Sequence, residues 1–246
     1  MRTNDLDLIK SIVDEAERVV FFGGAGVSTA SGIPDFKGVD GLYMKKEERG
    51  PRPEEILSGD FLYAHPEAFY KYYRENMIYP SALPNVAHLA LAELEKRGKL
   101  TTVITQNIDG LHQAAGSENV IELHGSVRRN YCIECRREYS LEDILETDGV
   151  PHCPLCGGLI RPDVTLYGEP LDRDAFYAAR EACFNTDVLL VGGTSLTVNP
   201  AASLVKAFLG EHFIIINKSI TPYDDYAEYI VRTPIEMVLQ YIAFGY

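Results

Sequence analysis

The stretch VVFFGGAGVSTASGIPDFKG, residues 19–38, decides the fold. Its first four residues are apolar and either β-branched or aromatic, which is typical of a buried strand. Gly23, Gly24 and Gly26 follow, and because they lack a Cβ they let a ligand approach the backbone closely. We expect Val27–Ser31 to open a helix whose free N–H groups and dipole favour a bound phosphate. The alternative is a tight turn, since the third glycine departs from the usual dinucleotide fingerprint.

The composition predicts one large domain, or one domain with an inserted lobe. The 246 residues include 36 Asp and Glu but only 23 Lys and Arg, which gives a net charge of −13. This charge disfavours nucleic acid as a partner and suits a cationic one. No run of 18 apolar residues is present, so we expect no membrane partner. The first ten residues lack the apolar core of a secretory signal, and we therefore expect a cytoplasmic protein.

Apolar strands that end in a polar or glycine cluster recur along the chain. After the first strand, we expect strands at residues 100–105, 120–123, 187–191 and 213–216. The clusters that follow them include Gln106, Asn107, Ile108 and Asp109, then His124, then Gly193, Thr194 and Ser195, and finally Asn217. The carboxyl ends of parallel strands share one edge of a sheet. Polar turns after strands are common, but five of them favour a shared binding site at that edge.

Four cysteines predict a structural metal site in an insertion between the third and fourth strands. Cys132-x-x-Cys135 and Cys153-x-x-Cys156 are separated by 17 residues, which is the spacing of a zinc ribbon. Four thiolates complete a tetrahedral Zn²⁺ shell and leave no open position for catalysis. The alternative of disulfides needs an oxidising compartment, which nothing in the sequence indicates. The fifth cysteine, Cys183, is expected to be a small buried hydrophobe.

The structure of the remaining segments is predicted from their composition, and for two of them an alternative stays open. Residues 32–43 contain many helix breakers and are expected to form a lid over a ligand, or else a plain surface loop. The aromatic residues in 50–84 favour small packed helices. A helix follows Pro84-Asn85 and ends at Gly98, and His88 within it is expected to pack rather than ligate. The extended segment 160–170 is expected either to pair with a peptide or to return the chain to the sheet.

Together these segments resemble the sirtuin (Sir2) family of NAD-dependent protein deacylases. The matching stretches occur in the order of the family and span nearly the whole chain. They are GAGVS (24–28), GIPDFKG (32–38), TQNID (105–109), LHG (123–125), the four cysteines, IRPDVTLYGE (160–169), GTSLTVNP (193–200) and Asn217.

The resemblance implies an α/β fold with a Rossmann-like parallel sheet, helices on both faces, and a small lobe made of a zinc ribbon and a helical module. The NAD-binding domain is expected at residues 1–34, 85–125 and 165–246. The cofactor loop and helical module are expected at 35–84, and the zinc module at 126–164. NAD and an acetyl-lysine peptide would enter the cleft between the lobes from opposite sides.

The resemblance also implies the site residues. The phosphates are expected at Gly24, Ala25, Gly26 and Thr29, and the adenosine half at Gly193, Thr194, Ser195, Asn217 and Lys218. Further cofactor contacts are expected from Phe36, Lys37, Tyr43, Gln106 and Asn107, with Ile108 and Asp109 at the nicotinamide carboxamide. The peptide is expected to bind Thr165, Tyr167, Gly168 and Val198, and the structural Zn²⁺ to bind Cys132, Cys135, Cys153 and Cys156.

The chemistry implied is deacetylation of lysine, with nicotinamide and O-acetyl-ADP-ribose as the other products and NAD consumed as a co-substrate. His124 is the expected base, because imidazole titrates near neutral pH, and Asn107 is expected to position the ribose hydroxyls. A monomer acting on an acetylated protein is expected. The alternatives are mono-ADP-ribosyltransfer or removal of other acyl groups on the same scaffold. A dehydrogenase leaves the four cysteines unexplained, and a zinc-ribbon adaptor leaves His124 and Asn107 unexplained.

Two departures from the family pattern bear on activity. Lys37 stands where arginine is usual and lacks the planar guanidinium fork. The subgroup that removes succinyl groups carries Tyr-x-x-Arg in the helical module. Here Tyr70 matches the tyrosine, but Tyr73 occupies the position of the arginine and Arg74 comes one residue later. This spacing favours neutral acyl groups.

Overall fold

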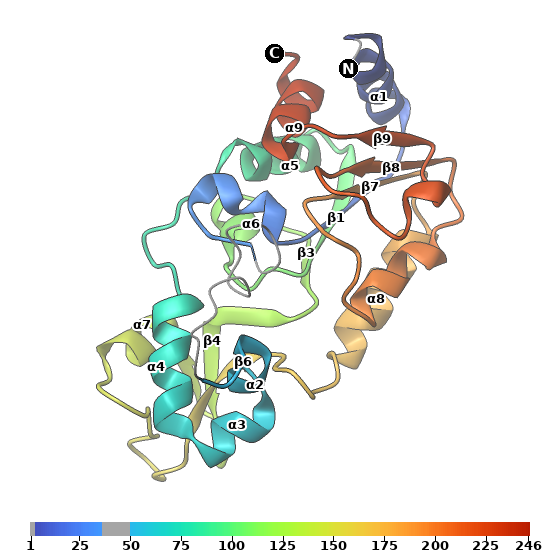
Figure 1. The fold of residues 1–246 in the computed structure, drawn as a ribbon. Helices are drawn as coiled ribbons and strands as arrows, with labels where there is room; N and C mark the ends of the chain where they lie inside the picture. The colour runs from blue at the N-terminus through green and yellow to red at the C-terminus, as the bar shows by residue number, and fades with distance from the viewer. Residues whose placement is uncertain (1–2, 36–49) are drawn as a thin grey trace.

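A parallel sheet of six strands forms the centre of the larger lobe. The computed structural model describes residues 3–35 and 50–246, and Figure 1 shows their fold. The strand order is β3-β2-β1-β7-β8-β9, which is the order of two βαβαβ halves in a Rossmann fold. The strands are β1 (Val19–Gly23), β2 (Leu100–Thr105), β3 (Val120–Glu122), β7 (Val188–Gly192), β8 (His212–Ile216) and β9 (Tyr229–Val231). The five expected strands are confirmed to within one residue at each end. The sequence did not predict β9, which has only three residues.

Helices cover both faces of this sheet, because alternate residues of each strand point to opposite sides. In β1, Phe21 packs with α1 (Thr3–Glu15), α5 (Val86–Lys96) and α9 (Ile235–Phe244). Its neighbour Phe22 packs on the other face, in the core that includes α8 (Arg173–Phe184) and the 3₁₀ helix η4 (Ala201–Ala207). The short helix α6 (Leu111–Ala114) follows β2. Among the described residues, no helix combines the length and apolarity needed to cross a membrane.

The chain after β1 does not form the expected α-helix. It makes two 3₁₀ turns, η1 (Ala25–Val27) and η2 (Thr29–Ser31), and Gly32 then reverses the chain at a φ of 84°. Gly26 meets the backbone of the loop after β7: its N–H donates to the Gly193 carbonyl at 2.8 Å. A Cβ on Gly26 would lie 2.7 Å from the Gly193 Cα. A neighbouring loop therefore requires this glycine, whatever ligand the turn binds.

The predicted start of α5 is confirmed and is tied to the glycine turn. The Asn85 side-chain oxygen accepts the N–H of Ala87 at 2.8 Å, which is the bond of a helix N-cap. The amide of Asn85 donates to the Val27 carbonyl at 2.8 Å and to the Ser31 hydroxyl at 2.9 Å. One side chain thus fixes both the beginning of α5 and the position of the glycine turn.

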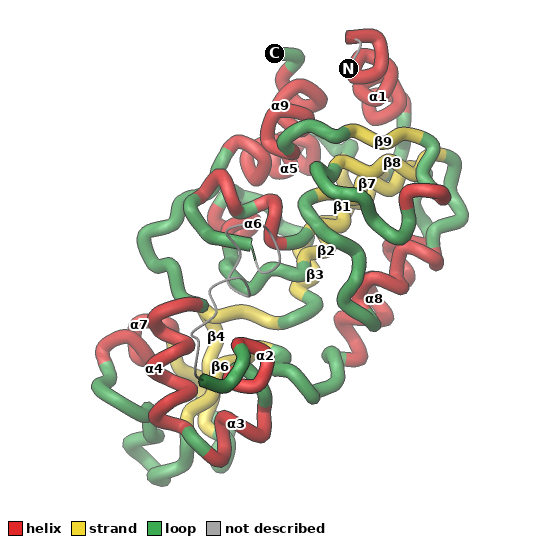
Figure 2. The backbone as a smooth tube through the Cα atoms, in the orientation of Figure 1, coloured by secondary structure: helices red, strands yellow, loops and turns green. Residues whose placement is uncertain are grey.

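The smaller lobe has its own sheet and core, and Figure 2 shows it set apart from the six-stranded sheet. The antiparallel strands β4 (Gly125–Cys132), β5 (Glu138–Ser140) and β6 (Ile160–Val164) lie in the order β5-β4-β6, and α7 (Leu141–Glu146) follows β5. The helices α2 (Pro53–Ile56), α3 (Gly59–Ala64) and α4 (Pro66–Asn76) pack beside them. Phe69, Tyr70 and Tyr73 of α4 are fully buried. The expected small helices packed by aromatic rings are therefore confirmed.

Two histidines are buried in contact with each other between α5 and α6. The ring centroids of His88 and His112 lie 4.8 Å apart, and neither ring nitrogen of His112 has a hydrogen-bond partner among the described residues. Burial, and to a smaller extent the adjacent His88, lower the pKa of His112 to about 3. Burial also lowers the pKa of His88. Both rings are therefore neutral at physiological pH.

This pair predicts a loss of stability in mild acid. The unfolded chain binds a proton at each histidine below about pH 6.5, whereas the folded chain does not, so the free energy of unfolding falls as the pH falls. The expected slope between pH 6.5 and 4 is about 1.4 kcal/mol per pH unit for each histidine. Urea unfolding of His112→Phe at several pH values should show a slope smaller by that amount. His65→Gln, at an exposed histidine, is the control; equal slopes for all three proteins would contradict the prediction.

Candidate active site

One cavity brings the predicted site residues together. It has a volume of about 850 Å³ and lies at the carboxyl edge of the large sheet, facing the smaller lobe. Its lining includes all the predicted cofactor, catalytic and peptide residues that the structure describes: Gly24, Ala25, Gly26, Thr29, Gln106, Asn107, Ile108, Asp109, His124, Thr165, Tyr167, Gly168, Gly193, Thr194, Ser195, Val198, Asn217 and Lys218. Phe36, Lys37, Tyr43 and most of the predicted lid lie outside the described residues.

His124 is held in the tautomer that a base requires. It follows β3, and its Nδ1 lies 2.8 Å from the Gln106 carbonyl oxygen. A carbonyl only accepts, so Nδ1 carries the proton and Nε2 keeps its lone pair. Burial lowers the pKa of His124, and the bond to Gln106 opposes that effect in part. The ring is therefore neutral at physiological pH.

Ser28 is a site residue that the sequence analysis did not assign. Its hydroxyl donates to the Asp109 carboxylate at 2.7 Å and accepts the Asn107 amide at 3.0 Å. Nε2 of His88 lies 3.5 Å from the same hydroxyl, while Nδ1 of His88 accepts the N–H of Asn85 at 3.2 Å. His88 is packed as expected, but it also borders the site. The GAGVS motif already contained Ser28, whereas its partners become visible only in three dimensions.

Hydrogen bonds join the ends of three strands beneath the cavity. The Gln106 side chain donates to the Thr194 hydroxyl at 2.9 Å, and the Gln106 N–H donates to the Gly23 carbonyl at 3.0 Å. A Cβ on Gly24 would lie 2.9 Å from the Thr194 Cβ. The loops after β1, β2 and β7 are therefore held in fixed positions relative to one another, in part by the hydrogen bonds of Gln106.

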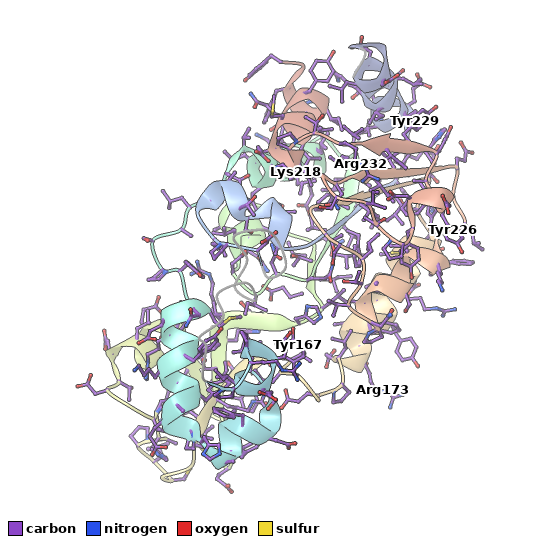
Figure 3. All side chains as sticks on the ribbon, in the orientation of Figure 1. Tyr167, Arg173, Lys218, Tyr226, Tyr229 and Arg232 are labelled. Carbon is purple, nitrogen blue, oxygen red and sulfur yellow. The ribbon has the colours of Figure 1, made fainter. Side chains whose placement is uncertain are left out.

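The predicted peptide segment is extended as β6 up to Val164, pairs with the helical module at Tyr167 and then turns: the Glu169 N–H donates to the Leu166 carbonyl at 3.0 Å, with Gly168 at a φ of 87°. The Tyr167 N–H donates to the Leu57 carbonyl at 2.9 Å, and the Tyr167 carbonyl accepts the Gly59 N–H at 3.2 Å. The Thr165 N–H donates to the His124 carbonyl at 3.0 Å, which joins this segment to the catalytic candidate. Figure 3 shows Tyr167 in the smaller lobe close to α2, far from Lys218 near α9. The two halves of the cavity thus come from different lobes.

The four predicted metal ligands converge, and their geometry fits zinc. The sulfur atoms of Cys132, Cys135, Cys153 and Cys156 all lie within 4.8 Å of one another. The Cys132–Cys156 and Cys135–Cys153 pairs are 3.5 and 3.6 Å apart. Tetrahedral Zn²⁺ with bonds of about 2.3 Å sets its sulfurs about 3.8 Å apart, so only a small expansion is needed.

Each cysteine pair sits on a knuckle that ends in a left-handed residue. The N–H groups of Arg136 and Gly157 donate back to the carbonyls of Cys132 and Cys153, at φ values of 60° and 76°. Glycine takes this conformation without strain, whereas the arginine gave no such signal in the sequence. The fifth cysteine, Cys183, is buried in α8, and burial raises the pKa of its thiol to about 12, so it behaves as the small hydrophobe expected.

The fold and cavity define a class, an α/β protein of the dinucleotide-binding type with a four-cysteine module. The model of the Sir2 family matches residues 24–200, and this chain belongs to that family. It is similar to the NAD-dependent protein deacetylase of Clostridium perfringens, with 49% identity over 235 residues, 95% of this chain and 96% of the relative. The corresponding protein of Clostridium tetani is 51% identical over 232 residues, 94% of each chain.

Solved structures agree with this assignment. A Sir2 protein with a p53 peptide and NAD⁺ has a TM-score of 0.84 and 39% identity, and the match covers 100% of this chain and 99% of that one. A second, with a deacetylated p53 peptide and 3′-O-acetyl-ADP-ribose, has a TM-score of 0.88 and 40% identity, covering 98% of both chains. The family inferred from the motifs and the α/β fold class are thus confirmed.

Removal of one cysteine ligand is predicted to release the zinc ion and thereby destabilise the smaller lobe. The core of the smaller lobe includes Cys132 and Cys153 themselves, so binding of metal is coupled to folding there. Cys132→Ala should reduce zinc from one ion per chain to much less, lower the melting temperature by several degrees and lower activity indirectly. Cys183→Ala is the matched control and should keep its zinc. Fully active, freshly purified wild-type protein without zinc by elemental analysis would contradict the prediction.

Proposed function

We propose that this chain is an NAD-dependent protein-lysine deacetylase, which transfers the acetyl group of acetyl-lysine to ADP-ribose and releases nicotinamide. The observation that carries the proposal is the lone pair of His124 Nε2 in a cavity shared by the glycine turn and the peptide segment. The relatives named NAD-dependent protein deacetylase support the reaction.

NAD is proposed to lie along the carboxyl edge of the large sheet. Gly24, Ala25, Gly26 and Thr29 would bind its phosphates, because backbone can approach the anion closely in this turn. Gly193, Thr194, Ser195, Asn217 and Lys218 would hold the adenosine half. Ile108 and Asp109 would hold the carboxamide, with the Ser28 hydroxyl fixing the Asp109 carboxylate. Phe36, Lys37, Tyr43 and Gln106 are the other proposed contacts.

His124 is proposed to remove a proton from a ribose hydroxyl, which then attacks the carbon of the acyl group. Bound NAD would supply the ADP-ribose acceptor, with the amide oxygen of the substrate replacing nicotinamide at the ribose C1′. The lysine amine would then leave the acyl carbon, and water would supply the remaining oxygen. The proton moves to Nε2, while Nδ1–H remains on the Gln106 carbonyl and keeps the ring in place. Asn107, already fixed by its bond to Ser28, would orient the ribose hydroxyls.

The acetyl-lysine peptide is proposed to lie as a strand between Val198 and residues 165–168, since Thr165, Tyr167, Gly168 and Val198 line the same cavity. We also propose the domain division 1–34, 85–125 and 165–246 for NAD binding, with modules at 35–84 and 126–164. We also propose a monomer that works in the cytoplasm on acetylated proteins, without nucleic acid or membrane, in line with the acidic charge of −13.

Replacement of His124 tests the mechanism. His124→Ala removes the base and should lower deacetylation by roughly 10²–10⁴-fold while the protein stays folded. Because the pKa of His124 lies below that of free histidine, the wild-type rate should be lost only as the pH falls below about 6.5, where Nε2 becomes protonated. Mass spectrometry of the products formed from an acetyl-lysine peptide and NAD measures both the effect of His124→Ala and the pH dependence of the wild-type rate. Undiminished turnover by a folded His124→Ala protein, or ADP-ribose found on the peptide, would contradict the proposal.

The acyl group is proposed to be small and neutral. The Arg74 guanidinium is bound to the carbonyls of Ile144 and Thr147, at 3.1 and 2.9 Å from Nη2, and does not line the cavity. Tyr73 does line it, with a buried hydroxyl that has no hydrogen-bond partner among the described residues. The hydroxyl of Tyr70 donates instead to the Ile160 carbonyl. Neither cation of this helix, Lys71 or Arg74, lines the cavity, so neither is placed to bind a succinyl carboxylate.

An acetyl peptide should exceed the matched succinyl peptide by at least about tenfold in kcat/KM, because a desolvated carboxylate without a cation is costly. Tyr73→Arg should narrow the gap by supplying a guanidinium at the cavity wall. Tyr73→Phe has no charge and serves as the control, for which the preference should persist. Equal rates on the two peptides with the wild-type protein would show that another cation reaches the acyl group.

A further inference from the structure

A buried ion pair lies directly behind the proposed peptide segment. Arg161 of β6 donates from both terminal nitrogens to the Glu169 carboxylate, at 2.7 and 2.9 Å. The Arg161 side chain is only 9% exposed and that of Glu169 is 25% exposed. The guanidinium holds the pKa of Glu169 below its usual range despite partial burial, which opposes this effect, so the pair is charged at neutral pH. Bidentate pairs of this kind fix the geometry of both partners.

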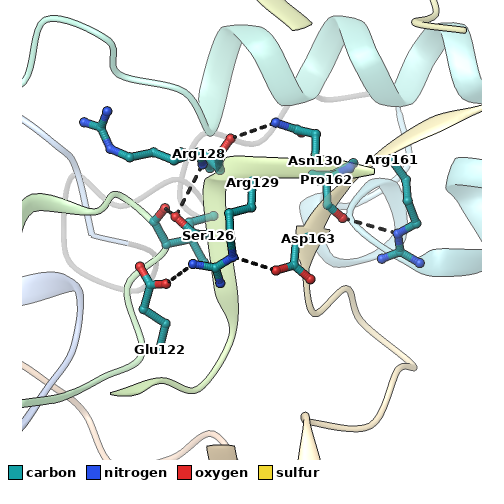
Figure 4. Close-up of polar contacts among 10 residues, drawn as sticks. Glu122, Ser126, Arg128, Arg129, Asn130, Arg161, Pro162 and Asp163 are labelled. Atoms are coloured by element: carbon teal, nitrogen blue, oxygen red, sulfur yellow. Dashed lines mark hydrogen bonds and ion pairs between the residues drawn. The ribbon is translucent and has the colours of Figure 1, made fainter. Parts of the chain in front are cut away.

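The same two side chains also bind the backbone where the segment begins. Glu169 accepts the N–H of Leu166 at 2.9 Å, and Arg161 donates from Nη2 to the Val164 carbonyl at 3.1 Å. Arg161 also donates from Nε to the Pro162 carbonyl at 3.3 Å, a contact shown in Figure 4. Residues 164–169 are therefore closed into a short loop by one arginine and one glutamate, which we name the Arg161–Glu169 clamp.

The clamped loop is also where the helical module joins the rest of the site. Tyr167 within it pairs with the backbone of Leu57 and Gly59. A Cβ on Gly59 would lie 2.9 Å from Glu169 Oε1, so the clamp packs closely against the start of α3. Glu169 lines the cavity but Arg161 does not, so the Arg161 variant is the one that separates positioning from direct contact with a ligand. Any effect of Arg161 on a ligand must therefore pass through Glu169 and the loop.

We propose that Arg161 is a positioning residue for the acyl-lysine peptide, and that it acts through Glu169 by holding the loop 164–169, with Tyr167 paired to Leu57 and Gly59, in place before the peptide arrives. This rests on the proposed function, because the strand partner is taken to be the substrate peptide. A peptide that adds as a strand gains main-chain hydrogen bonds only where the partner backbone is already held in position. If the partner must first be ordered, the cost of ordering is subtracted from binding.

The clamp should therefore affect peptide binding and leave NAD binding and the chemical step unchanged. Glu169→Ala removes both the ion pair and the acceptor for Leu166. We expect it to raise the peptide KM about tenfold or more, equivalent to about 1.4 kcal/mol of binding, with kcat and the NAD KM within twofold of wild type. Glu169→Gln keeps an acceptor for Leu166, and Arg161→Lys keeps the charge but not the fork, so both should lie between wild type and Glu169→Ala.

An arginine of the smaller lobe with two other carboxylate partners gives the matched control. Arg129 of β4 binds Glu122 and Asp163, and Figure 4 shows both contacts. Its side chain is 55% exposed, and Arg129 does not line the cavity. Arg129→Gln removes a guanidinium of the same kind without touching residues 164–169, so its peptide KM should match that of wild type.

Steady-state kinetics with an acetyl-lysine peptide, zinc content and hydrogen exchange at residues 165–168 test the proposal together. Support is a higher peptide KM and faster exchange in Glu169→Ala and Arg161→Lys, with one zinc retained and with Arg129→Gln unchanged. If Glu169→Ala does not fold, the peptide KM and hydrogen exchange of Arg161→Lys decide whether the proposal holds. A peptide KM within twofold of wild type, an equal rise in the NAD KM, or a rise in Glu169→Gln but not in Arg161→Lys would overturn it. Absence of any deacetylation by wild type would instead refute the proposed function itself.

Discussion

The contact between the loops after β1 and β7 is the constraint on which the site depends. The backbones of Gly26 and Gly193 meet through a hydrogen bond of 2.8 Å, and neither position has room for a Cβ. Strands β1 and β7 lie side by side at the point where the strand order reverses, which is where α/β sheets bind ligands. Because the loops touch, they form a continuous floor for the cavity. Gln106 and Thr194 extend that floor to the next strand.

The smaller lobe supplies the second wall of the cavity, opposite the edge of the large sheet. It is built from insertions after β1 and after β3, both of which leave the sheet at its carboxyl edge. The inserted segments therefore return to the same cavity, and the bond from the Thr165 N–H to the His124 carbonyl marks the junction. A half-buried neutral imidazole on one side and a backbone segment held by the smaller lobe on the other make a site suited to acyl transfer. The cysteine cluster stands apart and has no open position for chemistry.

Sequence patterns predicted those elements of the structure that are determined by residues close together in the chain. The apolar runs gave five of the six strands of the large sheet, Asn85 and Gly98 bounded a helix, and the cysteine spacing located the metal site. The α-helix expected after the glycine turn was wrong, because Gly32 and contacts with the β7 loop favour 3₁₀ turns there.

Other features depend on residues distant in sequence. The roles of Ser28 and Arg161 rest on partners that no local pattern indicates, and the carbonyls that bind Arg74 lie 70 or more residues away. The family motifs placed the site residues along the chain, and the structure gathers the described ones around one cavity. Their individual roles remain predictions.

The most direct test is whether loss of NAD depends on an acetylated lysine. Purified wild-type protein is incubated with NAD and either an acetyl-lysine peptide or the same peptide unmodified, and free nicotinamide is quantified beside the deacetylated peptide. The account predicts nicotinamide and deacetylated peptide in a one-to-one ratio, with neither formed from the unmodified peptide. Nicotinamide released equally with both peptides, or a reduced cofactor absorbing at about 340 nm in place of nicotinamide, would contradict it.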